Sequence, residues 1–222
     1  YQQRTMFSVA RPITMCRPTP THKHNKRFKI YSTAYKSVDP YRESSLRYMG
    51  YANELGEAFT SYLPEWGLPA SYCVAAAYVM FDTIDKGEKA YNAAEEEDKM
   101  MDTVRISTET FTWQMLASVF WPGSIIRVIV NMAATMISNN NLDNNQFIHF
   151  LPTLIGLSAI PMIVKPIDTT VDKIMEGSIS RVINGEINTP EEARTAMMTT
   201  AGSISVPPVM YCLASIIKKL EV

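Results

Sequence analysis

Residues 147 to 164 read FIHFLPTLIGLSAIPMIV, and this stretch gives the strongest indication of the fold class. It carries no formal charge, and ten of its 18 residues are Phe, Ile, Leu or Val. Each of these contributes roughly 0.3 to 0.6 kcal/mol to membrane insertion, which outweighs one His and two Pro. At a rise of about 1.5 Å per residue, the stretch is roughly 27 Å long, close to the thickness of a bilayer core. It predicts a membrane span that ends abruptly at Lys165 and Pro166.

The rest of the chain separates charged from apolar residues along its length. Hydrophobic residues fill 46% and charged residues 19% of the 222 positions, values that also suit a soluble domain. The distribution is more informative, because residues 1–38 hold eight bases and no acid, whereas residues 82–109 hold nine acids and four bases. We predict a basic N-terminal arm over residues 1–38, with the composition of a mitochondrial targeting segment.

Three further apolar stretches are candidate spans. Residues 66–81 are uncharged, and small residues four apart, such as Ser71 and Ala75, allow helices to approach closely in lipid. Residues 111–137 are apolar except for Arg127 and contain Pro122-Gly123; one kinked span is our prediction and a re-entrant hairpin is the alternative. Residues 200–217 contain two prolines, so a buried or interfacial helix is the alternative to a fourth span.

Asp39-Pro40 predicts the start of an amphipathic helix before the first span, with Asp as the N-cap and Pro at the first helical position. Apolar residues then recur every three or four positions up to about Leu63. This helix is too polar to span, so it should lie at the interface or pack on the bundle. Other helix starts are predicted at Pro166 and at Thr189-Pro190. The predicted fold class is all-α: an integral membrane bundle of three or four transmembrane helices plus an amphipathic helix.

These stretches divide the chain into three parts. They are the basic arm 1–38, a membrane domain 39–176 with spans near 66–81, 111–137 and 147–164, and a C-terminal extension 177–222 with a span near 200–217. Four spans place both termini on one side and the acidic loop on the other; in an inner mitochondrial membrane the termini would face the matrix.

The chain lacks the sequence signs of an enzyme or a metalloprotein. No nucleophile with a base, no phosphate-binding glycine loop and no His or Cys at metal-ligand spacing is present in the sequence, so we expect no enzymatic activity, no metal and no cofactor. Binding of a phospholipid such as cardiolipin is compatible with the sequence. The basic arm has no nucleic-acid-binding fold around it, so we expect no nucleic acid as a partner.

The sequence resembles the mitochondrial fission process protein 1 family over roughly residues 41–175. The residues that carry the resemblance are Arg47-Tyr48, Gly50-Tyr51-Ala52-Asn53-Glu54, Gly56-Glu57-Ala58-Phe59, Ser71-Tyr72, Val74-Ala75, Asp82, Ile84-Asp85-Lys86-Gly87, Lys89-Ala90, Trp113-Gln114, Leu116-Ala117-Ser118-Val119, Pro122-Gly123, Arg127, Gly156-Leu157, Ile160-Pro161, Pro166-Ile167-Asp168 and Val171-Asp172. The resemblance implies a mitochondrial inner-membrane protein that acts in division and inner-membrane integrity without chemistry of its own. The basic arm and the tail after Glu176 exceed the family pattern.

Polar residues beside or inside the spans are the candidate contact residues. Asn53, Glu54 and Glu57 form either a patch that holds a partner helix or the solvated side of the amphipathic helix. Arg127 either pairs with a carboxylate in the bundle or snorkels to a lipid phosphate, and snorkelling needs fewer assumptions. The full set of candidate partner or lipid contacts is Arg47, Tyr51, Asn53, Glu54, Glu57, Asp82, Asp85, Arg127, Asp168 and Asp172.

Two pairs of acids suggest one sharper hypothesis. Asp82 with Asp85, and Asp168 with Asp172, each share a helix face just outside a predicted span, on the same side of the membrane. They would form a joint site for a divalent cation or a lipid headgroup, or, more simply, charges that mark helix ends at the membrane boundary.

Two functions remain open on sequence alone. The arm and the extension favour a structural accessory subunit of a large respiratory-chain or ATP-synthase assembly, with inner-membrane lipids and other membrane subunits of that complex as partners. The alternative is a free mitochondrial fission and inner-membrane integrity factor. A small transporter is less favoured, because the spans are interrupted by Pro and Gly but show no inverted repeat.

Overall fold

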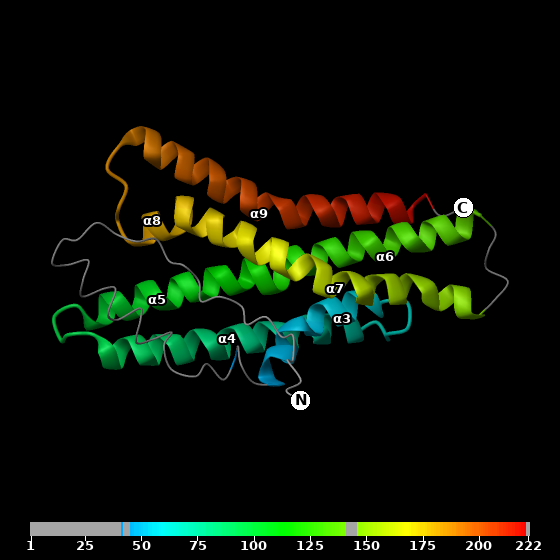
Figure 1. The fold of residues 1–222 in the computed structure, drawn as a ribbon, viewed down its shortest axis with the longest axis horizontal. Coiled ribbons are helices and arrows are strands. Elements are labelled where there is room, and N and C mark those ends of the chain that lie inside the picture. The colour runs from blue at the N-terminus through cyan, green and yellow to red at the C-terminus, as the bar shows by residue number, and fades with distance from the viewer. Residues whose placement is uncertain (1–40, 42–44, 141–145, 221–222) are drawn as a thin grey trace, which may run out of the picture.

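The computed structural model describes residue 41, residues 45–140 and residues 146–220, and in these ranges the only regular secondary structure is helical. The basic arm, the Asp39-Pro40 helix start and the polar turn after residue 140 lie outside the described residues. The elements, labelled in Figure 1, are the 3₁₀ helix η1 (Ser45–Tyr51), α3 (Ala52–Ala58), α4 (Gly67–Ala93), α5 (Lys99–Gln114), the π-helical η2 (Met115–Phe120), α6 (Trp121–Asn139), α7 (Gln146–Ile174), the π-helical η3 (Met175–Ile179), α8 (Ser180–Ile183) and α9 (Pro190–Lys218).

The segment before the first predicted span is shorter than expected. The sequence predicts one amphipathic helix up to Leu63, but the α-helical part is limited to α3, and turns follow from Phe59. Gly56 explains part of this, because its missing side chain lets α3 lie directly against Ser71 of α4, where a Cβ atom would clash. Packing against α4 therefore replaces the regular surface helix that the periodicity predicts.

α5, η2 and α6 form one continuous helical rod from Lys99 to Asn139. The re-entrant hairpin is therefore wrong, and the Pro122-Gly123 pair does not reverse the chain. The π-helical turn η2 ends at Phe120, two residues before Pro122, in the region where proline removes a backbone donor. A wider turn at this point absorbs the irregularity without breaking the rod.

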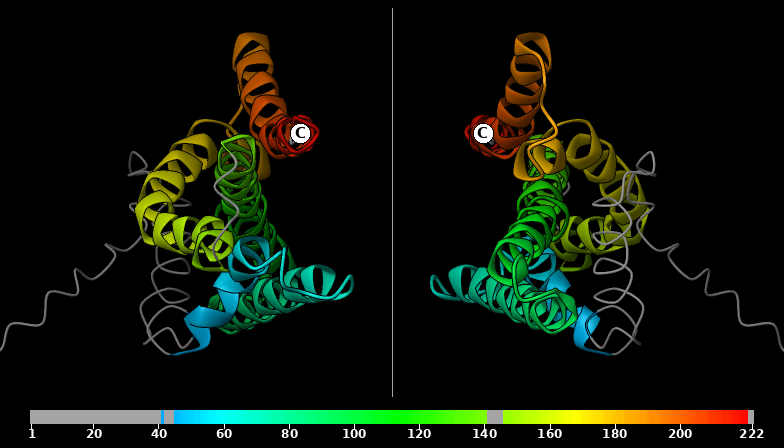
Figure 2. Two further views of the ribbon diagram at one scale, coloured as in Figure 1. Left: turned by 90° about the vertical axis from the view of Figure 1, so that its right-hand side faces the viewer. Right: turned by 90° about the vertical axis from the view of Figure 1, so that its left-hand side faces the viewer.

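α7, η3 and α8 form a second continuous rod, from Gln146 to Ile183. The predicted break at Pro166 is wrong, because Pro152, Pro161 and Pro166 all lie inside α7. The rod curves instead, as its arc in Figure 2 shows. Ile167 and Val171, which follow the last proline, are buried in an apolar cluster with Leu116, and this packing favours a continuous helix.

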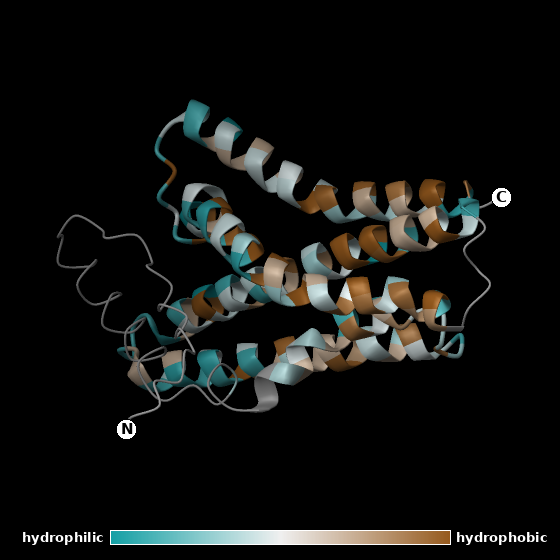
Figure 3. Ribbon diagram, turned by 45° about the vertical axis from the view of Figure 1, so that its right-hand side comes forward, coloured by the Kyte–Doolittle hydropathy of each residue, from teal (hydrophilic) through white to brown (hydrophobic). Residues whose placement is uncertain are grey.

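Three helices are long and apolar enough to cross a membrane: residues 99–139, 147–183 and 190–218, with 41, 37 and 29 residues. This confirms the all-α membrane-bundle class. A span needs about 20 residues, so each helix exceeds the hydrocarbon core. Apolar residues collect at one end of the bundle and polar residues at the other (Figure 3). α4, which contains the predicted span 66–81, does not belong to these three, and the division of the chain into three parts stays a prediction.

α6 lies at the centre of the bundle and contacts α3, α7 and α9. α4 packs against α5 and α3 on one side (Figure 1). The acidic turn between α4 and α5 and the C-terminal end of α9 lie at opposite ends of the molecule (Figure 1). Gly156 of α7 faces Ala58 of α3 and Val130 of α6, so three helices meet around a residue without a side chain.

Candidate functional site: a buried polar cluster

Four polar side chains from four helices meet inside the bundle, and we refer to Glu57, Tyr72, Arg127 and Tyr211 as the polar cluster. Arg127 Nε of α6 donates to Glu57 Oε2 of α3 at 2.8 Å, and Tyr72 Oη of α4 donates to Glu57 Oε1 at 2.6 Å. The hydroxyls of Tyr72 and Tyr211 lie 2.5 Å apart. The Arg127 guanidinium lies 4.7 Å from the centre of the Tyr211 ring of α9. The Glu57–Arg127 ion pair joins α3 to α6, and the two Tyr side chains add α4 and α9 to the cluster.

The observed contacts of Arg127 contradict the snorkelling arrangement that the sequence favoured. Its partner is a carboxylate of the same chain, so snorkelling to a lipid phosphate is not its arrangement in this structure. Glu57 is fully buried, while Arg127 keeps about a third of its side chain exposed. The Arg partner and the Tyr donor satisfy both oxygens of the buried carboxylate, which offsets the cost of removing its charge from water.

Asn53 and Glu54 are also completely buried, so the solvated-side interpretation of the amphipathic helix is wrong. Asn53 Nδ2 donates to the Val119 carbonyl at 2.9 Å, within the π-helical turn η2. Gly123 leaves room for this contact, because a Cβ atom there would lie 2.9 Å from Asn53 Nδ2 and 2.5 Å from Tyr72 Oη. These polar residues hold helices of their own chain.

Glu54 differs from its neighbours because, among the described residues, neither of its carboxylate oxygens has a hydrogen-bond partner on another residue. Burial raises the pKa of the Glu54 carboxyl to about 8, and its own backbone amide opposes this only in part. A carboxyl in such a place is neutral near pH 7. It lies one helical turn before Glu57 on the same face of α3.

A second buried ion pair lies in α4. Lys86 Nζ is 3.1 Å from Asp82 Oδ1 and 3.1 Å from Asp85 Oδ2, and the Lys86 and Asp82 side chains are fully buried. Asp82 also accepts a hydrogen bond from Gln114 Nε2 of α5, and Asp85 binds Lys89. These acids do not mark a helix end, because α4 continues to Ala93.

The structure does not assemble the two acidic pairs into a cation site. Asp172 Oδ1 accepts a hydrogen bond from the Trp113 indole of α5 at 2.7 Å, and Asp82 is committed to Lys86 and Gln114. Within residues 45–140 and 146–220, no group of three or more His, Cys, Asp or Glu is placed to hold a metal ion. Asp168 is partly exposed in α7, Tyr51 is partly buried at the end of η1, and the Arg47 side chain lies outside the described part.

Sequence reasoning missed Tyr72, Tyr211, Gln114, Trp113 and Lys86. Tyr72 and Tyr211 interrupt apolar stretches, and a buried Tyr hydroxyl needs a partner, so both could have been suspected. Lys86 lies four residues after Asp82, the spacing of an ion pair on one helix. The contacts that these residues make across the bundle depend on helix packing. Helix packing cannot be predicted from the spacing of residues in the sequence.

The long apolar helices and the intrahelical and interhelical ion pairs define a helical membrane protein. The family model for the Mitochondrial 18 KDa protein (MTP18) matches residues 85–175. Mitochondrial fission process protein 1 of Danio rerio is 40% identical over 151 residues, which cover 68% of this chain and 92% of that protein. The Homo sapiens protein of the same name is 37% identical over 65% of this chain and 87% of its own length.

The chain belongs to the mitochondrial fission process protein 1 family, which confirms the resemblance in the sequence. The Caenorhabditis elegans relative, 34% identical over 66% of this chain and 89% of its own length, agrees with this. No solved structure matches the chain. Arg127 lies within the range that the family model matches, whereas Glu57, Tyr72 and Tyr211 lie outside it.

Proposed function

We propose that this chain is a mitochondrial fission factor embedded as a multi-pass bundle in the inner membrane. The observation that carries the proposal is the identity of 40% over almost the whole length of a protein named mitochondrial fission process protein 1. This supports the function that sequence analysis held as its alternative. None of the named relatives is a respiratory-chain or ATP-synthase subunit, so the accessory-subunit hypothesis has no support from them.

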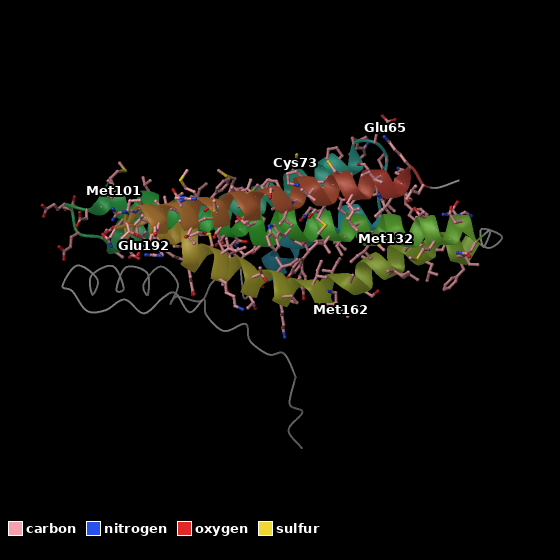
Figure 4. The ribbon with its side chains drawn as sticks, turned by 90° about the horizontal axis from the view of Figure 1, so that it is seen from above. Glu65, Cys73, Met101, Met132, Met162 and Glu192 are labelled. Atoms are coloured by element: carbon pink, nitrogen blue, oxygen red, sulfur yellow. The ribbon has the colours of Figure 1, made fainter. Side chains whose placement is uncertain are left out.

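The apolar surface of the bundle supports the membrane part of the proposal. Met162 of α7 and Ile204 and Val209 of α9 are more than half exposed, and Met162 points outward in Figure 4. Side chains of this kind are solvated by lipid tails at no cost, whereas in water they would favour aggregation. We propose inner-membrane lipids as contacts of these faces, with a phospholipid such as cardiolipin among them.

We propose a non-enzymatic role without a cofactor and without nucleic acid. The polar cluster is made of groups that pair with one another, and such a cluster positions helices rather than substrates. Partners would then be membrane proteins of the division machinery, bound through surfaces outside the cluster.

Depletion of the protein in its own cells tests the function. We expect mitochondria to become longer and more connected, and re-expression of the wild-type chain to restore their length. The length distribution of mitochondria, measured by fluorescence microscopy, is the readout. Unchanged mitochondrial length after complete depletion would overturn the proposal.

Fractionation tests the membrane placement separately. We expect the chain to resist extraction from mitochondrial membranes by alkaline carbonate, and to remain protease-protected until the outer membrane is opened. Release into the carbonate supernatant would contradict the multi-pass bundle, and digestion in intact mitochondria would contradict the inner membrane.

A further inference from the structure

The hairpin of α4 and α5 carries apolar side chains on a surface that the described helices leave exposed. Ile84 and Tyr91 share one face of α4, because they are two helical turns apart. Met101, Val104 and Phe111 share one face of α5 for the same reason. Ile84, Met101 and Val104 are more than half exposed, and the two aromatic side chains more than a third. We refer to these five residues as the outer face.

Both parts of the outer face lie on the same side of the hairpin. On the opposite side, α4 packs through Val79 against Val119 of η2. α5 contacts the residue after α8 on that side, where Glu109 accepts a hydrogen bond from Asn184 at 2.9 Å. Because each helix turns these inner residues toward the rest of the bundle, the outer face points away from it.

The register of the two helices makes the outer face continuous. Gly87 brings them close together, since a Cβ atom there would lie 2.5 Å from Ser107 Oγ. In an antiparallel hairpin, Tyr91 then comes level with the first turn of α5, which holds Met101. Lys99 Nζ of that turn lies 4.4 Å from the centre of the Tyr91 ring, in agreement with this register. The five side chains therefore form one apolar surface that crosses both helices.

The outer face belongs to the polar end of the molecule. α4 and α5 meet in the acidic turn, at the end opposite the C-terminal end of α9 (Figure 1), where polar residues collect (Figure 3). With the apolar end in lipid, as proposed above, this face extends into water. Exposed apolar side chains in lipid need no partner, whereas a group of them in water marks an interaction site.

Negative charge surrounds the outer face. Residues 82–109 hold nine acids and four bases, and each base is within ion-pair distance of an acid of its own helix or turn: Lys86 with Asp82, Lys89 with Asp85, Lys99 with Glu96 and Arg105 with Asp102. Glu88, Glu97 and Asp98 are exposed and form no ion pair with another described residue. Glu88 lies between Ile84 and Tyr91 on the face itself. A molecule that covers this surface should therefore supply bases.

We propose that the outer face binds an amphipathic helix of a partner protein, with apolar side chains along one side and Lys or Arg at its edges. The apolar side of that helix packs across α4 and α5, and its bases pair with Glu88, Glu97 and Asp98. A second copy of the chain is disfavoured, because copies in one membrane share an orientation and would bring their acidic turns together. The same three acids repel an anionic lipid surface.

A synthetic peptide can stand in for the partner. It consists of Leu and Lys, is about 18 residues long, has Leu along one helix face, and carries a fluorophore and one photoreactive benzoylphenylalanine in place of a Leu. The target is the full chain in nanodiscs of phosphatidylcholine, and empty nanodiscs give the binding to lipid alone. Fluorescence anisotropy measures the affinity, and photo-cross-linking with mass spectrometry locates the peptide on the chain.

We expect saturable binding above that of empty nanodiscs, with cross-links to the outer face. A peptide with Glu in place of every Lys should bind about tenfold more weakly. Val104→Lys should weaken binding of the Leu/Lys peptide about tenfold, and the exposed position should leave the fold intact. Met197→Lys is the matched control, because it adds the same charge at an exposed apolar residue of α9, which packs on α6. It should bind the peptide like the wild type.

Three results would overturn the proposal. Binding no stronger than to empty nanodiscs, or cross-links outside α4 and α5, would show association with lipid alone. Equal weakening by Val104→Lys and Met197→Lys would show attraction to the overall charge of the chain and no defined site. Cross-links between outer faces of two chains, formed without peptide, would assign the face to a homodimer. The effect of depletion on mitochondrial length tests the fission role independently of each of these results.

Discussion

Arg127 and Glu57 show how a single residue pair can organise this bundle. They lie 70 positions apart in the chain, and each provides the opposite charge for the other. Glu57 has no access to solvent, so its charge depends on Arg127 and on the Tyr72 hydroxyl. Removing one partner of such a pair costs more than removing both, because the remaining charge stays buried.

Replacing Arg127 with Leu should therefore lower the free energy of unfolding by about 3 to 5 kcal/mol. The double variant Glu57→Gln/Arg127→Leu should recover part of this loss. Denaturant titration in detergent micelles, followed by circular dichroism, measures both. Losses that simply add in the double variant would contradict a direct ion pair.

The pKa of Glu54 also predicts a pH dependence of stability. The folded-state pKa is raised to about 8 from 4.5, so between these values the folded chain binds more protons than the unfolded chain. Stability should then be greatest at low pH and fall by about 1.4 kcal/mol per pH unit as the pH rises through this window, becoming flat above it. Glu54→Gln should remove this contribution, and an equally steep fall in that variant would assign the slope to another group.

Sequence analysis identified Arg127, Glu57 and Glu54 as candidates but not their arrangement. A charged residue inside an apolar stretch is a candidate for a buried contact, and Arg127 was identified in this way. Their partners lie on other helices, and the choice between snorkelling and pairing depends on which helix faces α6. Burial of Asn53 and Glu54 was missed for the same reason, since helical periodicity alone treats polar residues as the solvated side.

Among the helices, α6 compensates for Pro207 of α9. Pro207 cannot donate to the Ser203 carbonyl, which an ordinary residue at that position would satisfy. The Trp121 indole donates to this carbonyl instead, at 3.1 Å. Further along, Asn131 Nδ2 donates to the Ala214 carbonyl at 3.0 Å. α6 thus supplies side-chain donors to the second half of α9, from Ser203 onward.

A double-mutant cycle tests this compensation. Trp121→Phe should cost about 1 kcal/mol more in the wild type than in a Pro207→Ala background, because the backbone amide restored by that substitution can satisfy the Ser203 carbonyl. The stabilities of the four chains, measured by thermal unfolding in micelles, give the coupling. A coupling near zero would show that the indole hydrogen bond does not serve this carbonyl.

Close helix crossings make a further prediction. Gly123→Ala should destabilise the bundle by about 1 to 3 kcal/mol, because its methyl group would overlap Tyr72 and Asn53. Gly202→Ala in α9 is the matched control, since nothing lies within 4 Å of that site, and it should stabilise the helix by about 0.4 to 1 kcal/mol. Thermal unfolding measures the stability of the two variants. Equal changes in stability at both positions would contradict a close helix crossing at Gly123.

The long helices could be predicted from sequence, but their bounds could not. The uncharged stretch 147–164 correctly predicts a helix. The usual effect of proline on a helix predicts that it ends at Pro166, whereas α7 continues to Ile174. Burial of Ile167 and Val171 against Leu116 and Ala117 of η2 outweighs the lost hydrogen bond. The same kind of long-range packing shortens α3 and inserts a π turn before Pro122, so these details required the assembled bundle.

For the whole molecule, the helices are longer than a membrane requires. The rod from residue 99 to 139 is about 60 Å long at 1.5 Å per residue, roughly twice a bilayer core. The end of the bundle where this rod begins carries the acidic turn, and Met101 of the rod and Glu192 of α9 both lie there (Figure 4). With its apolar half in lipid, the polar half of the bundle would extend into water.

The chain is expected to act as a fission factor and not as a fixed subunit of a large energy-converting complex. Native electrophoresis of mitochondrial membranes in mild detergent, with mass spectrometry of the band that carries the chain, distinguishes these two roles. We predict a small species that is not stoichiometric with any respiratory or ATP-synthase complex. Quantitative migration within one such megadalton complex would contradict the claim and restore the accessory-subunit hypothesis.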